Sequence, residues 1–362
     1  MFDKLTGMPE FDTSSISGMP TKEKSFAGQR FLAPPAGTHF VDCDFSGTYW
    51  DGVTFEGQLF TRCNFSGAQF VGCILMTVRF FECAAASARF QRTLTTECHW
   101  ESGAWGDCQW LECRLARQMI NAVRGGNWEF RVCDISFSTL SSLALTGLRV
   151  ESSLIRDLSL VESKVHDQCW QECVMERVIS ANATFGGGQW LGCQGINNRW
   201  MGIKARHLAY QSCHFQQSAW SSCEIAGGDF LANVLHIAHF DSGKLHRLHF
   251  RGNTLYAIAF DASLLCECEF REREVSHFSL RNARLESCDL NGLTGSDLDA
   301  RGCSMQGTTV NGARFVDANV AGQQPADWRG ADLDLARFEI PEELQDLDWW
   351  KTCRPGVTRS IQ

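Results

Sequence analysis

Apolar residues recur at every fifth position along most of the chain. Steps of five from Phe40 to Leu290 give 51 positions, of which 47 are apolar and 25 are aromatic. Side chains point in the same direction at every second residue of a strand and about every 3.6 residues of a helix. Neither element alone therefore explains a period of five. Because no insertion interrupts the period, we interpret each group of five as one repeated structural step of a repeat architecture.

A longer period of 20 residues is superimposed on the period of five. The column that starts at Trp50 and advances by 20 is aromatic at 11 of 13 positions, and the column from Phe40 is aromatic at eight of 13. The two columns between them hold four and two aromatic residues. We therefore expect residues 20 apart to stack, with two opposite aromatic sides and two aliphatic sides in each turn. The predicted structural core includes Trp50, Phe70, Phe90, Trp110, Phe130, Trp170, Trp190, Tyr210, Phe230, Phe250 and Phe270.

Cysteines follow the same register. Fourteen of the 18 cysteines lie two residues before a position of the five-residue series, where small residues such as Ala, Ser and Thr also occur. This pattern predicts a slot for a small, buried side chain, with Cys173, Cys193 and Cys213 one turn apart in the core. Zinc motifs place cysteines in C-x2-C pairs, which this sequence lacks, so we favour a structural role over a metal site or disulfides. So many adjacent thiols indicate a reducing compartment, with the cysteines reduced.

Several five-residue segments resemble the pentapeptide-repeat family. Examples are CDFSG (43–47), CNFSG (63–67), ARFQR (88–92) and CDLNG (288–292), each with a small residue, a polar residue, Leu or Phe, and two mostly polar residues. The resemblance covers roughly residues 38–340. It implies an all-β fold, a right-handed, four-sided (quadrilateral) parallel β-helix with one pentapeptide per side. At a spacing of about 4.8 Å, 13 or more turns would form a rod roughly 60 Å long.

The ends of the chain depart from the repeat. Residues 1–37 lack the register and are predicted to form an irregular N-terminal cap, ahead of a β-helix over residues 38–340. The register weakens after residue 290, where Leu293, Leu298 and Cys303 indicate a shift of phase.

Residues 341–362 are predicted to form a short C-terminal helix and a tail. Pro341 suits the first position of a helix. Trp349 and Trp350 lie outside the repeat, and only one of them can readily face the last turn. The other is a candidate anchor for a protein partner or for a homodimer formed through this end, since Trp is enriched at interfaces. The alternative is that both are buried in the cap.

The sequence carries no recognised catalytic motif. It contains no G-x-S-x-G, H-E-x-x-H, G-x-G-x-x-G or Walker A pattern, and we expect no enzyme activity and no catalytic residues. His236, His239, His246 and His249 lie within 14 residues of one another, but successive pairs fall on different sides of a turn. We therefore expect no metal and no cofactor. A core filled with side chains is also expected to leave no interior pocket for a small ligand.

Charge and hydropathy narrow the classes of function. The net charge is −9, which argues against direct binding of nucleic acid through phosphate contacts. The apolar runs are too short for a membrane span, and the N-terminus lacks the apolar region of a secretory signal. A repeat rod with a satisfied core presents its outer faces for protein recognition, so a protein partner is the expectation.

Strings of the form F-x2-C and W-x2-C give the chain a Trp- and Cys-rich style, for example at Phe60–Cys63, Trp110–Cys113 and Trp190–Cys193. In this style it is similar to pentapeptide-repeat proteins found with the spike and effector genes of bacterial type VI secretion systems. The resemblance implies a cytoplasmic bacterial adaptor or chaperone that helps to load an effector onto the spike.

The alternative within the same family is an acidic mimic of DNA that binds DNA gyrase or topoisomerase IV and protects it from inhibitors. Residues 40–290 hold 22 basic and 27 acidic residues, a net charge of −5. A DNA mimic 60 Å long would carry roughly 35 negative charges, so we place this alternative second. An enzyme built on the repeat as a scaffold is the more remote alternative.

Overall fold

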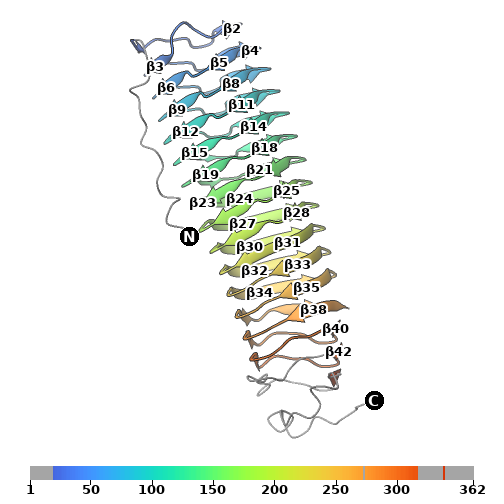
Figure 1. Cartoon of the computed structure of the whole chain (residues 1–362). Coiled ribbons are helices and arrows are strands. Elements are labelled where there is room, and N and C mark those ends of the chain that lie inside the picture. Colours follow the sequence, from blue (N-terminus) through green and yellow to red (C-terminus); the bar gives the residue numbers. More distant parts are fainter. Residues whose placement is uncertain (1–18, 272–273, 317–336, 339–362) are drawn as a thin grey trace.

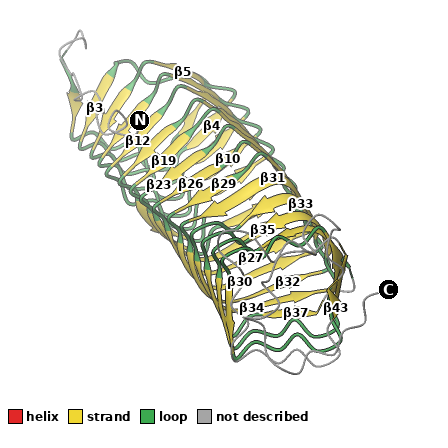
Figure 2. Ribbon diagram, turned by 60° about the horizontal axis from the view of Figure 1, so that its bottom comes forward, coloured by secondary structure: helices red, strands yellow, loops and turns green. Residues whose placement is uncertain are grey.

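The computed structural model of the chain describes residues 19–271, 274–316 and 337–338. These residues form an all-β parallel solenoid of about 14 turns that stack along one axis (Figure 1). The described ranges contain strands and loops and no helix, and therefore none that is long and apolar enough to cross a membrane (Figure 2). The all-β parallel fold is thus confirmed, while the helix predicted within residues 341–362 lies outside the described residues.

Strand pairing follows the 20-residue period. Phe90 of β10 (Arg89–Gln91) pairs in parallel with Phe70 of β7 (Gln69–Val71) on one side and with Trp110 of β13 (Gln109–Leu111) on the other. Most strands have these proportions, comprising one position of the five-residue series, here called the pentad centre, and its two neighbours. The longer strands are β24 (Lys164–Gln171), β27 (Thr184–Leu191), β30 (Lys204–Gln211), β31 (His214–Ser221), β32 (Glu224–Leu231), β33 (Val234–His239), β34 (Lys244–Arg251), β35 (Thr254–Ala259) and β38 (Val275–Ser279).

A residue in the left-handed conformation turns the chain at every corner. Each described residue two positions after a pentad centre, from Asp42 to Gly312, has a positive φ. Since this conformation recurs every five residues and the pairing every 20, one turn has four sides. Glycine, Asn and Asp adopt this conformation most readily. Val132 and Phe137 are bulky exceptions, with φ of 55° and 51°, and both side chains are exposed.

Replacing Val132 with Asn is expected to raise the free energy of unfolding by about 1 kcal/mol, because Asn tolerates the left-handed conformation that costs a β-branched residue more. The matched control is Val161→Asn, at an outward position of β23 (Ser159–Val161), where φ is not positive and no gain is expected. Urea unfolding followed by circular dichroism measures both changes. Equal effects at the two sites would contradict the corner assignment.

Aromatic ladders fill the interior of two opposite sides. The rings of Phe70 and Phe90 stack with centroids 4.7 Å apart, and those of Trp200 and Trp220 stack at 4.5 Å. Edge-to-face contacts join the two ladders, as between Phe230 and Phe240 at 5.8 Å. Such offset and edge-on pairs contribute about 0.5–1.5 kcal/mol beyond area burial. The predicted aromatic columns are therefore confirmed.

The solenoid begins before the predicted boundary at residue 38. Strands β1 (Thr21–Lys22) and β2 (Arg30–Phe31) pair with β3 (His39–Val41) and β4 (Tyr49–Asp51), but the paired residues are 19 apart, as Thr21 and Phe40 are. The ring of Phe26 stacks on Phe45 at 4.8 Å, and Phe31 stacks on Trp50 at 4.1 Å. This turn is one residue shorter than the regular turns of 20 residues. For that reason its register could not be recognised in the sequence. The described part of the segment expected as an irregular cap is thus a solenoid turn.

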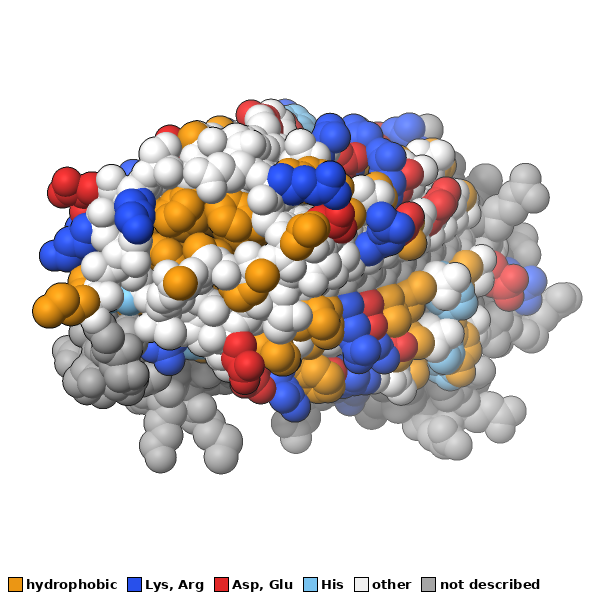
Figure 3. All heavy atoms as spheres, turned by 90° about the horizontal axis from the view of Figure 1, so that it is seen from above, with side chains coloured by type: hydrophobic (Ala, Val, Ile, Leu, Met, Phe, Trp, Pro, Cys, Tyr) orange, Lys and Arg blue, Asp and Glu red, His pale blue; other side chains and the backbone are white. Residues whose placement is uncertain are grey.

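Apolar side chains gather in the middle of the surface when the molecule is viewed from its N-terminal end (Figure 3). Phe26 and Phe31 are partly buried against the core, and Leu32 beside them is exposed.

The register continues unchanged from residue 290 to residue 316. Strand β40 (Thr294–Ser296) pairs with β42 (Arg314–Val316) at the regular spacing of 20 residues. Leu293 and Leu298 are buried in the slot two residues before a centre, while the centre between them is Gly295. The predicted shift of phase is therefore wrong, because large and small residues exchange places within an unchanged backbone register. Pairing of β42 with β43 (Arg337–Phe338) then spans 23 residues, so this last interval holds three more than a regular turn.

In the middle of the solenoid, too, a small residue occupies the pentad centre and a large residue occupies the slot. Gly125 lies at a pentad centre, and the buried Trp128 occupies the following slot. The indole Nε1 of Trp128 donates a hydrogen bond of 2.5 Å to the carbonyl oxygen of Trp105. A Cβ atom on Gly125 would collide with that same oxygen. The empty centre thus allows the large indole to fill the interior from the slot.

Candidate protein-binding surface

The predicted core residues lie inside the solenoid. All are buried, the most exposed being Trp170 at 8%. The group comprises Trp50, Phe70, Phe90, Trp110, Phe130, Trp170, Trp190, Tyr210, Phe230, Phe250, Phe270, Cys173, Cys193 and Cys213. Trp349 and Trp350 lie outside the described residues, so their role in partner binding stays a prediction.

The slot before each centre is a hydrogen-bonding position as well as a small space. The thiol of Cys63 donates to the carbonyl oxygens of Phe40 and Thr61, each at 3.5 Å. Burial raises the pKa of Cys98 and of Cys108 to about 12, which keeps these thiols protonated and unreactive. The described cysteines form no disulfide, as expected for a structural slot. Sequence reasoning identified the slot by residue size and missed its hydrogen bonds.

Several charges on the outer surface are paired between successive turns. At the corners, Arg62 contacts Asp42 at 2.7 Å and Arg177 contacts Asp157 at 2.6 Å. The hydrogen bond from Arg177 holds the pKa of the Asp157 carboxyl below its usual value. Exposed pairs of this kind stabilise a protein little. Their larger effect is to intersperse the two signs of charge, as Figure 3 shows on the end view.

A polar trough lies on the outer surface of the solenoid, on the side that contains β7, β10, β13 and β17 (Glu129–Arg131). Its volume is about 400 Å³. Each strand contributes the residues on either side of its buried centre, so two rows of side chains run along the solenoid axis. The rows are Gln69, Arg89, Gln109 and Glu129, and Val71, Gln91, Leu111 and Arg131.

At one end of the trough the side chains that line it bond to one another. At the other end, here called the open end, they do not. Gln109 donates a hydrogen bond of 3.0 Å to Glu129, whose carboxylate also contacts Arg131 at 2.8 Å. In contrast, the side chains of Gln69, Arg89 and Gln91 have no hydrogen-bond or ion-pair partner among the described residues. The open end therefore offers two amides and a guanidinium that another chain could bind.

A second depression, of about 360 Å³, adjoins the trough at Glu129. It continues along the same row of outward positions through Arg149 to Cys169. This surface was not predicted from the sequence, because the outward positions were not compared from one turn to the next. The available signal was the recurrence of Gln at outward positions of the aromatic column, at Gln69, Gln91 and Gln109.

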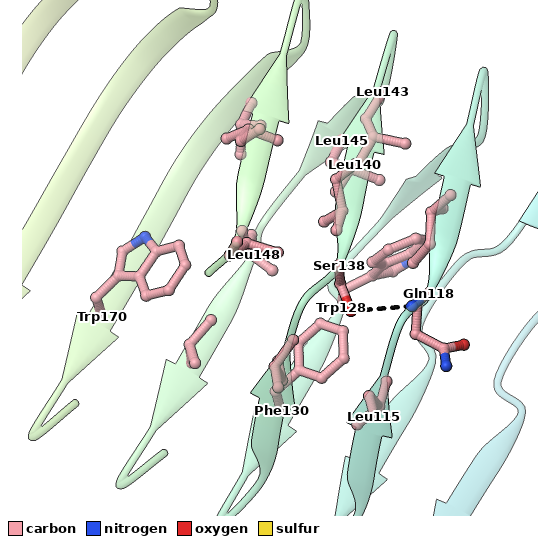
Figure 4. Close-up of a pocket in the computed structure, with 16 residues that line it drawn as sticks. Leu115, Gln118, Trp128, Phe130, Ser138, Leu140, Leu143, Leu145, Leu148 and Trp170 are labelled. Carbon is pink, nitrogen blue, oxygen red and sulfur yellow. Dashed lines mark hydrogen bonds between the residues drawn. The ribbon is translucent and has the colours of Figure 1, made fainter. Parts of the chain in front are cut away.

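The interior also holds an apolar cavity of about 40 Å³, in the stretch where the rings give way to aliphatic residues (Figure 4). Val150 stands between Phe130 and Trp170 in the aromatic column, and all three line the cavity. Figure 4 shows Leu140, Leu145 and Leu148 around the same space. The core is therefore not completely filled, but this cavity is far smaller than the roughly 300–1,000 Å³ of a small-molecule site. Aliphatic side chains are smaller than the rings they replace in the stack.

Replacing Val150 with Phe is expected to fill this cavity and raise the free energy of unfolding by about 1 kcal/mol. The matched control is Ile155→Phe, which adds a ring at a fully buried centre that does not line the cavity. That change should instead overpack the core and lower stability by about 1–3 kcal/mol. Chemical denaturation of both variants gives the comparison, and destabilisation by Val150→Phe to the same extent would refute the cavity.

Comparison with known proteins supports the five-residue repeat and does not establish a function for the chain. A family model described as pentapeptide repeats matches residues 38–75 in eight copies. No curated protein sequence matches the chain.

Among solved structures, QnrB1, a plasmid-mediated fluoroquinolone resistance protein, is 18% identical, with 51% of this chain and 91% of QnrB1 covered and a TM-score of 0.29. HetL, a pentapeptide repeat protein involved in heterocyst differentiation regulation in the cyanobacterium Nostoc sp. strain PCC 7120, is 14% identical, with 60% and 91% covered and a TM-score of 0.20. The tailspike of E. coli bacteriophage HK620 is 10% identical, with 89% and 71% covered and a TM-score of 0.39.

Identities and TM-scores this low are no basis for assigning a function. The fold rests on the chain's own geometry, in which the left-handed corners recur every five residues and the parallel pairing every 20. Residues 38–75 thus match pentapeptide repeats, and over the described residues as a whole the geometry is that of a parallel β-helix with five residues per side.

Proposed function

We propose that the chain is a non-catalytic scaffold that binds a protein partner along the trough over β7, β10, β13 and β17. The observation that carries the proposal is the unpartnered set of Gln69, Arg89 and Gln91, held on adjacent rigid strands. Side-chain amides can hydrogen-bond the backbone of an extended segment, and the guanidinium can pair with a carboxylate on it. The trough thus suits an extended, acidic segment of a partner.

The partner class that we propose is an effector or spike component of a bacterial type VI secretion system, for which this protein acts as an adaptor or chaperone. This step is supported by the Trp- and Cys-rich style of the repeats and by the length of the solenoid, which offers a long, pre-organised surface. A rigid solenoid loses little conformational entropy on binding, which favours the capture of a flexible segment.

The pairing of surface charges argues against mimicry of DNA. A mimic needs a continuous row of uncompensated carboxylates, whereas acidic groups such as Asp42, Asp157 and Asp261 contact an arginine one turn away. Gyrase binding is therefore an outcome that the experiment must distinguish and is not a second proposal.

The test is affinity purification of the tagged, full-length protein from its native host, followed by mass spectrometry. Wild type is compared with Arg89→Glu, which reverses the charge of the open end of the trough. The matched control is Arg199→Glu, on β29 (Arg199–Met201) of another side, where Arg199 is also exposed and forms no ion pair among the described residues. We expect wild type and the control to recover an effector or spike protein and Arg89→Glu to lose it. Recovery of gyrase subunits, or equal recovery by all three proteins, would contradict the proposal.

A further inference from the structure

Three different ligand groups meet on the outside of a second side of the solenoid. His246 lies on β34, and Cys266 lies on β36 (Leu264–Cys266) directly beside it in the next turn. Glu267 follows at the corner. A ring nitrogen of His246, the sulfur of Cys266 and a carboxylate oxygen of Glu267 all lie within 4.8 Å of one another.

The spacing of these atoms is close to that of a metal site. In tetrahedral zinc sites the Zn–N and Zn–O distances are about 2.0–2.2 Å and Zn–S is about 2.3 Å, which places ligand atoms about 3.3–3.7 Å apart. The Nε2 atom of His246 is already 3.6 Å from Oε1 of Glu267. Small rotations of exposed side chains would bring the sulfur to the same separation.

The carboxylate is oriented by a neighbouring side chain. Nε of Arg247 donates a hydrogen bond of 2.7 Å to Oε2 of Glu267, which leaves Oε1 facing His246. Metal ligands are commonly fixed by second hydrogen bonds of this kind.

Cys266 differs from the cysteines of the slot. Their thiols are buried and donate to backbone carbonyls, as Cys268 donates to Leu245 at 3.4 Å. The thiol of Cys266 is partly exposed and has no hydrogen-bond partner among the described residues.

We propose that His246, Cys266 and Glu267 bind one divalent cation of the zinc class. The combination of imidazole, thiolate and carboxylate suits a borderline-soft metal better than magnesium or calcium, which prefer oxygen ligands. The three side chains occupy three positions and leave the fourth to water. A bound ion joins two successive turns on their outer face. No metal was expected from the sequence because the cysteines and the histidines were considered separately, whereas the 20-residue spacing of His246 and Cys266 places them side by side.

The first test uses Co²⁺ as a spectroscopic probe of the reduced, full-length protein. Wild type should bind one Co²⁺ with a thiolate-to-metal charge-transfer band, which Zn²⁺ displaces. Cys266→Ser should lose the band, and His246→Gln should weaken binding roughly tenfold or more. The matched control, Cys169→Ser, removes the other partly exposed described cysteine and should leave the band intact.

Circular dichroism of each variant establishes that the solenoid is still folded, and native mass spectrometry with Zn²⁺ gives the stoichiometry independently. Absence of the band from folded wild type, or its persistence in Cys266→Ser, would overturn the proposal. Loss of the band in Cys169→Ser would overturn it as well, because the metal would then lie elsewhere.

Discussion

Replacing Trp220 with Ala is expected to lower the free energy of unfolding by about 3–5 kcal/mol, as measured by urea denaturation. The indole is 1% exposed and stacks between Trp200 at 4.5 Å and Phe240 at 4.6 Å. Tyr210 meets it edge-on at 6.1 Å, and the indole Nε1 lies 3.5 Å from the Tyr210 hydroxyl. The substitution therefore opens a cavity, interrupts one ladder and leaves the Tyr210 hydroxyl without its indole donor.

The loss should be local, because each turn of a solenoid contacts only its neighbours. Hydrogen exchange is expected to accelerate in the strands around Trp220 and to change little near Phe60. The control Trp220→Phe keeps a ring in the stack and should cost less than half as much. A loss below about 1 kcal/mol in Trp220→Ala would contradict the role of the ladder as the main source of stability.

Replacing Gly125 with Leu is expected to lower the free energy of unfolding by about 3 kcal/mol or more. The new side chain collides with the Trp105 carbonyl and displaces the indole of Trp128, which loses its hydrogen bond. The control Gly106→Leu adds the same side chain at an outward position where nothing lies within 4 Å of an added Cβ. That change should alter stability by no more than about 0.5 kcal/mol.

A double substitution tests directly whether the small centre, Gly125, and the large slot residue, Trp128, depend on each other. Gly125→Leu combined with Trp128→Ala restores the usual arrangement of a large centre and a small slot. We expect it to be more stable than the sum of the two single changes predicts, with a coupling energy of about 1–3 kcal/mol. Strict additivity of the two effects would show that Gly125 and Trp128 do not share one interior space.

The period of the sequence predicts which residues share a side, and for that reason it predicted the core well. A ring at every twentieth position can be buried only if each turn has the same length, and Phe70 and Phe90 stack accordingly. The same reasoning failed where the length of a turn changed. Phe26 and Phe31 keep their spacing of five residues, but the 19-residue turn places them one position out of register.

Other features depend on details that periodicity does not contain. Whether Leu293 marks a change of phase or a filled slot depends on the size of its neighbour Gly295. The trough depends on which outward side chains find partners, and Gln91 and Gln109 differ in this although both are outward glutamines on neighbouring strands. The juxtaposition of His246 and Cys266 follows from the 20-residue period, but it becomes visible only when every residue type is placed on the turns.

Site-specific photo-crosslinking in the native host tests the binding surface most directly. A photoreactive residue is placed at Gln91 in the trough or, as a control, at Gln194, an outward position of β28 (Gln194–Ile196) on another side. We predict a crosslink from position 91 to a type VI effector or spike protein, and none from position 194. Equal crosslinking at both positions, a crosslink only at 194, or capture of a gyrase subunit at 91 would contradict the proposed binding surface.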